Sequence, residues 1–466
     1  MKRIFVLILT LSLLLGLCAC GGNQSGGAVE SDFLVGFGRT SITPQISVPL
    51  AGYGNTSTRY SKEVLNELYA TCIAMTDAEG NTILLISQDI IGSYMITLVR
   101  PTVSQATGVP QERIYLAGTH THSAPDQQSK QEAMSTYNGY YLRNVVEAAK
   151  MAMEDRVPAI AATGSVEVEN MNFVRHYLMN AGTYAGDNFG EWDSGIKDYA
   201  EPNDPQLQVI KFTRQGKKDV VMVNWQVHPK LTGGTTKYDV SSDFIGYTRD
   251  YVEQKTDSLM VYFTGAAGNQ NPTSRIQPEI VTKDAQLYGT QIGDYVLGVL
   301  QNLSAADTGT IKTKKTDYVA QVDLLLQDKL DEAKEVQALY KEKGRDEGNK
   351  LARQYGFSSV YHANAVINRK SYGKSQKVEV NAVSLGSIGF VTAAYEMFAS
   401  HGAAIKAASP FDTTFVITCC NGGNGYIPTQ QAHDYGCYES HTGRFVPGTG
   451  EELVQVLSES LTELKK

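Results

Sequence analysis

The sequence lacks the short motifs that identify several large classes of hydrolase and metal protein. It contains no G-x-S-x-G, which excludes the nucleophile turn of α/β-type serine hydrolases, and no H-E-x-x-H, which excludes the zinc helix of many metalloproteases. None of its six cysteines form a C-x-x-C pair, so a zinc knuckle is excluded as well. Gly373-Lys374-Ser375 resembles the end of a phosphate-binding loop, but Asn368 stands where that loop needs its first glycine. We interpret this segment as a turn.

Positively charged residues are in the minority. The 41 Lys and Arg stand against 49 Asp and Glu, which gives a formal net charge of −8 at pH 7. Because nucleic acid attracts basic proteins, we expect no nucleic-acid partner for this acidic chain, and no pattern points to a protein partner. With 466 residues that are 42% hydrophobic, the chain has enough material for the core of one large domain or two.

One long hydrophobic run occurs at the N-terminus, over residues 4–17, after Lys2 and Arg3. It is too short for a comfortable membrane span and is typical of an export signal. It ends in Leu17-Cys18-Ala19-Cys20, which resembles the bacterial lipoprotein box because a small residue precedes Cys20.

We therefore predict a lipoprotein signal peptide over residues 1–19 and a flexible tether over residues 20–31, which are rich in glycine and polar residues. A lipidated Cys20 would anchor the exported protein to the extracytoplasmic face of the bacterial cell membrane. An ordinary cleaved signal without a lipid is the alternative.

Four further cysteines stand in the rest of the chain: Cys72, Cys419, Cys420 and Cys437. Outside the cytosol a disulfide is allowed, and Cys437 could pair with Cys419 or Cys420. We favour unpaired, buried thiols.

Apolar periodicity predicts strands and helices that alternate over residues 32–466, with hairpins among them. We expect a mixed α/β fold in which a mixed β-sheet core is flanked by helices in a single large catalytic domain. The expected strands cover residues 33–38, 71–75, 82–87, 114–117, 160–168, 206–212, 220–227, 259–263, 378–385, 388–392 and 415–419, and the expected helices cover residues 94–106, 130–153, 244–254, 285–300, 327–353 and 451–464.

Two histidines follow the short apolar strand at 114–117, in the sequence T-H-T-H-S over residues 119–123. In extended backbone, positions i and i+2 project to the same side, so His120 and His122 can face one pocket, one holding a metal and the other moving a proton. The motif alone equally fits two polar histidines on a surface turn.

Other residues that can bind a metal also follow strands: His228, Glu396 and, after a glycine-rich loop, Tyr426. Two neutral imidazoles and one carboxylate are common ligands of a hydrolytic zinc ion, and a fourth oxygen ligand or a water completes the tetrahedron. Spacing leaves open whether these side chains converge.

Several short motifs are scattered over nearly the whole chain, and the set as a whole identifies a family more specifically than any single motif does. They are G-R-T-S-I-T-P over 38–44, T-H-T-H-S-A-P over 119–125, V-H-P over 227–229, Y-I-P-T over 426–429 and Y-E over 438–439. Together they resemble the catalytic domain of the neutral/alkaline (non-lysosomal) ceramidases, zinc amidases that split an N-acyl sphingosine into a fatty acid and an amine.

The resemblance implies roles for individual residues. His120, His228, Glu396 and Tyr426 match the zinc ligands, and His122 and Tyr438 match residues that handle the amide oxygen and protons. Arg175 matches an arginine near the scissile group. Zn²⁺ would lower the pKa of a bound water towards about 7 and polarise the carbonyl, and an imidazole beside it would move the proton.

One departure concerns the family's G-D-x-S-P-N segment. Here it is G-N-Q-N-P-T over 268–273, so Asn271 replaces the family's site serine. An amide is no nucleophile, although it can donate a hydrogen bond to an oxyanion. The zinc-water route is unaffected, but ordinary ceramide becomes a less expected substrate. The sequence ends soon after Tyr438, so we expect no C-terminal immunoglobulin-like domain.

We therefore expect a zinc-dependent hydrolase of a linear amide bond in a small-molecule or lipid N-acyl substrate. The alternatives are a non-catalytic surface lipoprotein that keeps the fold to bind a ligand, and an esterase or deacetylase acting on glycoconjugates. Asp89 and Asp243 could orient the metal ligands. We interpret the remaining histidines as bystanders: His176, His362, His401, His433 and His441.

Overall fold

The structure is a computed structural model that describes residues 31–53, 59–279 and 282–466. The predicted signal peptide over 1–19, the lipidated Cys20 and nearly all of the tether lie outside these residues.

Within the described residues, nine strands form a larger sheet. They are β1 (Leu34–Ser41), β2 (Tyr69–Thr76), β3 (Thr82–Gln88), β4 (Ile114–Gly118), β5 (Val157–Glu167), β10 (Gln206–Arg214), β11 (Val220–Trp225), β12 (Leu259–Thr264) and β14 (Ser304–Ala306). The order is β12-β11-β10-β5-β1-β2-β3-β4, and β14 pairs with β5. The pairs β3/β4 and β11/β12 are parallel, and the other pairs are antiparallel.

A second sheet stacks on the first. Its strands, in spatial order, are β15 (Ile311–Gln321), β16 (Ser375–Leu385), β17 (Ile388–Ala393) and β19 (Thr413–Ile417). Alternate side chains from both sheets fill the space between them, for example Phe212 and Phe263 from the larger sheet and Phe390 and Phe415 from the smaller one. Burial of these apolar faces holds the two sheets together.

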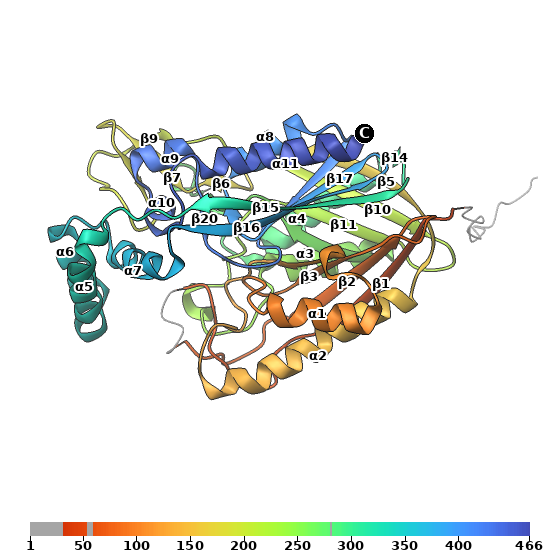
Figure 1. Cartoon of the computed structure of the whole chain (residues 1–466), viewed down its shortest axis with the longest axis horizontal. Coiled ribbons are helices and arrows are strands. Elements are labelled where there is room, and N and C mark those ends of the chain that lie inside the picture. Colours follow the sequence, from red (N-terminus) through yellow and green to blue (C-terminus); the bar gives the residue numbers. More distant parts are fainter. Residues whose placement is uncertain (1–30, 54–58, 280–281) are drawn as a thin grey trace, which may run out of the picture.

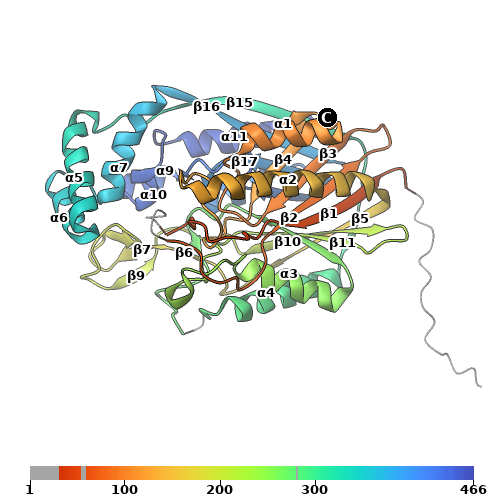
Figure 2. The same cartoon turned by 90° about the horizontal axis from the view of Figure 1, so that it is seen from below.

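Helices cover the outer faces of both sheets (Figure 1; Figure 2 gives the perpendicular view). One set consists of α1 (Ile96–Thr107) and α2 (Glu132–Glu154), a second of α3 (Phe244–Thr256) and α4 (Ala285–Leu300), and a third of α8 (Ala399–Ala408) and α11 (Thr449–Lys465). The first packs on β1–β4, the second on β10–β12 and the third on the smaller sheet. The core is therefore two stacked sheets between helical layers.

The close packing of α2 on β1 depends on glycine. A Cβ atom at Gly36 would lie 1.9 Å from Ala152 O, and one at Gly38 would lie 2.1 Å from Ala148 O. Any side chain at either position would push the helix away from the sheet.

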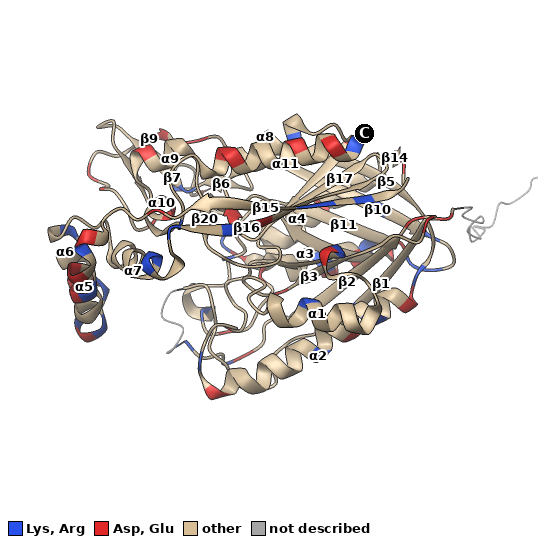
Figure 3. Cartoon of the chain, viewed as in Figure 1, with Lys and Arg blue, Asp and Glu red and all other residues tan. Residues whose placement is uncertain are grey.

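A helical projection stands at one end of the molecule (Figure 1). It consists of α5 (Leu330–Lys343), α6 (Arg345–Gln354) and α7 (Val360–Arg369), which share a small apolar core of their own. Acidic and basic side chains alternate on α5 and α6 (Figure 3), as expected of a solvated surface. Gly344, with φ of 87°, separates α5 from α6, which divides the single helix expected over 327–353.

Short elements complete the same end of the molecule. They are β6 (Phe173–Val174), β7 (His176–Met179), β8 (Tyr184–Gly186), β9 (Ile196–Tyr199), β13 (Gln270–Asn271), β18 (Glu396–Met397), β20 (Tyr426–Ile427), α9 (Gln430–Tyr435) and α10 (Tyr438–Thr442). The strands among them form three small sheets, β13-β6, β18-β20 and β8-β7-β9. β18, β20 and α10 carry Glu396, Tyr426 and Tyr438.

The mixed α/β class and the single domain are confirmed, and apart from the divided helix over 327–353 the expected strands and helices occur with shifts of a few residues at their ends. The largest omission is β15, whose sequence I-K-T-K-K-T-D-Y-V-A-Q lacks a continuous apolar face. It is an edge strand, where exposed lysines discourage pairing with other chains, and this makes its pattern look like a loop.

Two further expectations can be compared with the structure. Cys72, Cys419, Cys420 and Cys437 are all buried free thiols, as favoured above. Among the helices of the described ranges, none combines the length and apolar content needed to cross a membrane.

Candidate active site

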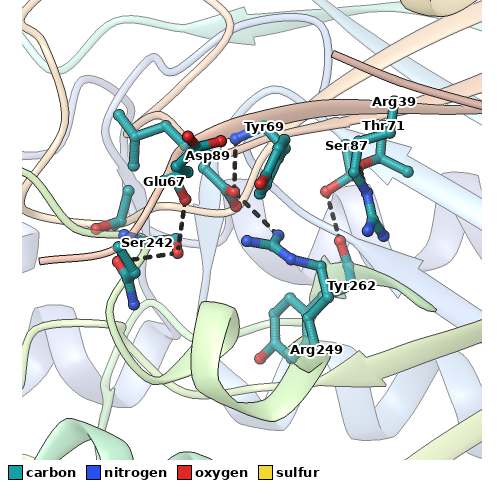
Figure 4. Close-up of polar contacts among 12 residues, drawn as sticks. Arg39, Glu67, Tyr69, Thr71, Ser87, Asp89, Ser242, Arg249 and Tyr262 are labelled. Carbon is teal, nitrogen blue, oxygen red and sulfur yellow. Dashed lines mark hydrogen bonds and ion pairs between the residues drawn. The ribbon is translucent and has the colours of Figure 1, made fainter. Parts of the chain in front are cut away.

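The two ends of the larger sheet approach each other, although β3 and β4 stand far from β12 in the strand order. Ser87 Oγ in β3 donates to Tyr262 O in β12 at 2.6 Å (Figure 4). At the strand ends, Thr264 Oγ1 donates to Thr119 O at 2.6 Å. The loops that follow β4 and β11 are thereby brought together.

These loops carry His120 and His228, whose ring centroids lie 4.8 Å apart. His120 Nδ1 lies 2.7 Å from Ile91 O, and His228 Nδ1 lies 2.7 Å from Ala267 O. A carbonyl oxygen only accepts, so Nδ1 carries a proton in both rings and Nε2 is the nitrogen that can bind a metal ion. Both Nε2 atoms face Glu396 Oε2, at 3.2 Å from His120 and 3.3 Å from His228.

This donor set fits a divalent cation such as zinc. Two imidazole nitrogens and one carboxylate oxygen point at a common position, and the buried Glu396 Oε2 has no hydrogen-bond donor. Burial alone would raise the pKa of the Glu396 carboxyl, but a proton shared with His120, whose own pKa is raised, holds it well below its ordinary value, and a bound cation would take the place of that proton. The carboxylate is therefore ionised, as a metal ligand must be.

The His122 ring also lies beside those of His120 and His228, but the backbone conformation that puts it there differs from the expected one. His120 has a φ of 72°, so the backbone turns there and the extended i, i+2 geometry assumed from the sequence is wrong. His122 N instead donates to Pro229 O at 3.2 Å. A Cβ atom at Gly52 would lie 2.5 Å from His122 Cβ, so this glycine makes room for the ring.

The His122 ring is poised as a neutral base. Its centroid lies 5.2 Å from that of His120 and 5.5 Å from that of His228, and one ring nitrogen lies within 4.8 Å of ligand atoms of both. Both ring nitrogens are buried without a hydrogen-bond partner. Burial, and then the two neighbouring imidazoles, lower its pKa well below the ordinary value, so the ring is neutral at neutral pH, and its nitrogens are free of hydrogen-bond partners.

Tyr426 and Arg175 complete the cluster. Tyr426 stands directly opposite Glu396 in the parallel β18/β20 ladder. The Arg175 guanidinium lies over the Tyr426 ring, 5.6 Å from its centroid, and its Nη1 lies 3.5 Å from His228 Nε2. The Tyr438 ring lies 6.0 Å from that of Tyr426. The structure therefore brings these predicted site residues together.

Sequence reasoning missed Glu439, which supports Arg175 from behind. Arg175 Nε donates to Glu439 Oε1 at 2.7 Å, and His176 Nε2 lies 2.8 Å from Glu439 Oε2. His176, interpreted above as a bystander, thus belongs to the support of the site, and Tyr435 contacts its other nitrogen. The available signal for Glu439 was its place directly after Tyr438.

Among the described residues, no hydrogen bond or ring contact joins Asn271 to the other predicted site residues. Asn271 lies in β13 opposite Phe173, and its buried Oδ1 has no hydrogen-bond partner. The neighbouring Gln270 O accepts from the His228 amide at 3.0 Å. The segment therefore helps to position His228, whereas a hydrogen bond from Asn271 to an oxyanion stays a prediction.

A cavity of about 350 Å³ opens beside these residues. His122, Arg175, Tyr426 and Tyr438 line it, together with Lys230 and other polar residues. A second cavity of about 340 Å³ includes Glu396 in its wall and shares Tyr438 with the first. A substrate can thus reach the cluster from two sides.

The expectation that Asp89 and Asp243 orient the histidines is wrong. Asp89 Oδ2 accepts from Arg249 at 3.0 Å and from the Tyr69 amide at 2.9 Å (Figure 4). Asp243 accepts from the amides of Phe244 and Thr232. Backbone carbonyls orient the imidazoles instead, and they leave no signature in a sequence.

Comparisons with known proteins bear on the family and on the fold. The family model described as neutral/alkaline non-lysosomal ceramidase, N-terminal, matches residues 33–286. The fold is similar to that of neutral ceramidase from Pseudomonas aeruginosa, with a TM-score of 0.69 and 16% identity over 94% of this chain and 75% of that chain. It is also similar to a structure described as ceramidase complexed with C2, with a TM-score of 0.68 and 15% identity over 94% of this chain and 76% of the other.

Proposed function

The chain belongs to the neutral/alkaline non-lysosomal ceramidase family, and from this premise we propose that it is a zinc-dependent amidase that hydrolyses a linear N-acyl bond. Membership supports a hydrolase of the ceramidase type. The observation that carries the proposal is the convergence of His120 Nε2 and His228 Nε2 on Glu396 Oε2. Tyr426, opposite Glu396, is the proposed fourth ligand.

A bound zinc ion would supply an acidified water and a polarised carbonyl. His122 takes the proton of the attacking water and returns it to the departing amine, because its imidazole is neutral and its nitrogens are unpaired. Arg175 brings a permanent positive charge to the same wall of the cavity, where the amide oxygen becomes negative.

Tyr438 serves as a hydrogen-bond donor to the amide. Burial, and then the nearby Glu439 carboxylate, raise the pKa of its phenol above the ordinary value. The phenol therefore keeps its proton at neutral pH and can donate to the developing oxyanion. Because Asn271 cannot act as a nucleophile, water is the attacking group in this proposal.

We also propose that the protein is exported and anchored in the membrane by a lipid on Cys20. The support is the sequence L-C-A-C over residues 17–20 after an apolar run. A lipid anchor would place the site at the membrane surface.

Metal analysis of the purified protein tests the core of the proposal. We expect close to one zinc ion per chain, with a sharp loss of zinc in His120→Ala and His228→Ala. His433→Ala is the matched control, because His433 is absent from the metal-capable cluster. Equal zinc content in all four proteins would remove the proposed site.

Activity assays separate the alternatives once zinc is found. Hydrolysis of N-acyl amines that disappears in His122→Ala supports the amidase, whereas cleavage of acetylated sugars or esters alone would favour the esterase or deacetylase. If the zinc-containing protein hydrolyses none of these substrates, the result would favour the non-catalytic, ligand-binding lipoprotein.

A further inference from the structure

We propose that the substrate carries an oxyanion, a carboxylate or a phosphate, on the part that enters the cavity beside His122, and that Lys230 and Arg345 bind it. This inference rests on the proposed function and names its substrate class. The occupant is thus a compact acidic N-acyl compound rather than a lipid with two long apolar chains.

The wall of this cavity suits charge and hydrogen bonding. Among the described residues that line it, there is no aliphatic side chain: the wall is built from tyrosines, one glycine and one histidine, together with asparagine, aspartate, lysine and arginines. The tyrosine rings offer some apolar surface, but a long hydrocarbon chain would also take water away from the charged groups of the wall. Its volume, about 350 Å³, is at the small end of ligand sites.

The cations of the wall outnumber its carboxylates. Arg175, Lys230 and Arg345 face one carboxylate, that of Asp187. Glu439, behind the wall, already pairs with Arg175. Asp187 is therefore the single carboxylate of the wall, it pairs with Lys230 and Arg275, and Arg345 has no countercharge within 4.0 Å among the described residues, so an oxyanion in the cavity would restore the balance.

Lys230 is held where it can act. It follows His228-Pro229, and its backbone oxygen accepts from Tyr53 OH at 3.0 Å. Its side chain is 20% exposed, and its Nζ lies 3.5 Å from Asp187 Oδ2, a loose pair that Asp187 divides with Arg275 at 3.8 Å. Two of the three ammonium donors remain available to a ligand.

Arg345 comes from a different part of the chain, the first residue of α6 in the helical projection. It forms no ion pair with any described residue within 4.0 Å. A cation at a helix N-terminus opposes the helix dipole, so helix stability does not account for this residue. The position of Arg345 on the cavity wall does account for it. Through this residue the helical projection takes part in recognising the substrate.

The second cavity offers no apolar channel either. Asn364, Asn368, Gln128 and Arg444 are among its lining residues, and Ala365 is the one aliphatic side chain among the described residues that line it. Neither side of the cluster therefore provides a groove for a long alkyl chain.

Three substrates with one acyl group test the inference: N-octanoyl glycine, N-octanoyl phosphoethanolamine and the neutral N-octanoyl ethanolamine. We expect kcat/KM for at least one anionic substrate to exceed that for the neutral one about tenfold, as a charge-assisted hydrogen bond provides. Comparison of kcat/KM for N-octanoyl glycine and N-octanoyl phosphoethanolamine identifies whether a carboxylate or a phosphate is preferred.

Variants of Lys230 and Arg345 test whether these two residues cause the preference for anionic substrates. Lys230→Met and Arg345→Gln should each lower the ratio of anionic to neutral kcat/KM several-fold, mainly through KM, and Lys230→Arg should recover most of it. Lys334→Met, an exposed lysine of α5 paired with Asp331, should leave the ratio at its wild-type value. A preference for the neutral substrate, or an unchanged ratio in both variants, would overturn the inference.

Binding distinguishes this failure from failure of the proposed function. N-octanoyl glycine and N-octanoyl ethanolamine are titrated calorimetrically into His122→Ala, which keeps Lys230 and Arg345. If the wild type hydrolyses nothing but the anionic compound binds more tightly, the amidase is wrong and the anion site stands. Equal affinities would remove the anion site.

Discussion

The buried carboxylate of Glu439 accepts a hydrogen bond from Arg175 Nε at 2.7 Å, and the two side chains are 1% and 7% exposed. Burial alone would raise the pKa of this carboxyl, but His176 and Arg175 hold it well below its ordinary value. The charge of Glu439 therefore fixes the guanidinium that faces His228 and the cavity.

Replacement of Glu439 by glutamine should harm both stability and activity. The variant keeps the shape but leaves Arg175 without its countercharge, which typically costs about 3–5 kcal/mol when both groups are buried. We expect a lower free energy of unfolding in urea and a fall in kcat of at least about tenfold. Zinc content should stay near one per chain, because Glu439 is no ligand in this proposal. Wild-type stability together with wild-type kcat would show that the pair has no positioning role.

Gly52→Ala should slow catalysis without removing the metal. A Cβ atom at this position meets His122 Cβ at 2.5 Å, so the imidazole must move away from its neighbours. A displacement of this kind is expected to lower kcat about a hundredfold while zinc content persists.

Gly80→Ala is the matched control for Gly52→Ala. Gly80 also has a positive φ, 85° against 109°, but a Cβ atom there meets nothing within 4 Å. The two variants should therefore lose similar stability from backbone strain, about 1–3 kcal/mol, and differ in kcat. Equal activities would show that the ring tolerates the methyl group.

The part of the site that could be predicted from the sequence consists of residues in local motifs. His120, His228, Glu396 and Tyr426 each follow an apolar strand or a glycine-rich loop, and a strand end is a position that a sequence reveals. The fold class was predictable for the same reason, because period-two and helical patterns are local.

The residues that were missed depend on contacts between distant segments. Arg345 reaches the cavity only because the helical projection folds back on it, and its sequence neighbours suggest a solvated helix. Likewise, the left-handed backbone at His120 is imposed by tertiary contacts, such as the hydrogen bond from its amide to Ile90 O. A non-glycine residue adopts that conformation only rarely, so the sequence alone does not predict it at His120.

The ion pair between Arg100 and Glu379 should make stability depend on pH below about 5. Burial opposes the charged carboxylate, but Arg100 prevails and lowers the pKa of Glu379 from 4.5 to about 2. A depressed folded-state pKa contributes stability that is complete above the unfolded value and is lost as the pH falls towards the folded one. Because solvent partly screens this pair, we expect it to contribute about 1–2 kcal/mol to the free energy of unfolding above pH 5.

Urea unfolding of the wild type and Glu379→Gln at several pH values checks this. The difference in unfolding free energy should be constant from pH 7 to about 5 and should shrink steadily from pH 5 to 3. A difference that stays the same at pH 3 would contradict the assigned coupling, since at that pH the carboxyl is protonated in the unfolded chain and must release its proton when the wild type folds.

The lipid anchor is tested by exchanging the two N-terminal cysteines separately. Cys20→Ser removes the only thiol that follows a small residue in the box, so the protein should leave the membrane fraction and lose incorporation of a labelled fatty acid. Cys18→Ser is the matched control and should keep both, because Leu17 precedes that position. Since a single acyl chain binds membranes only weakly, whereas a fully acylated lipoprotein is retained through washing, the fractions should be compared after a high-salt wash. Membrane retention of Cys20→Ser under these conditions would exclude Cys20 as the anchor and would support an ordinary signal peptide with another mode of attachment.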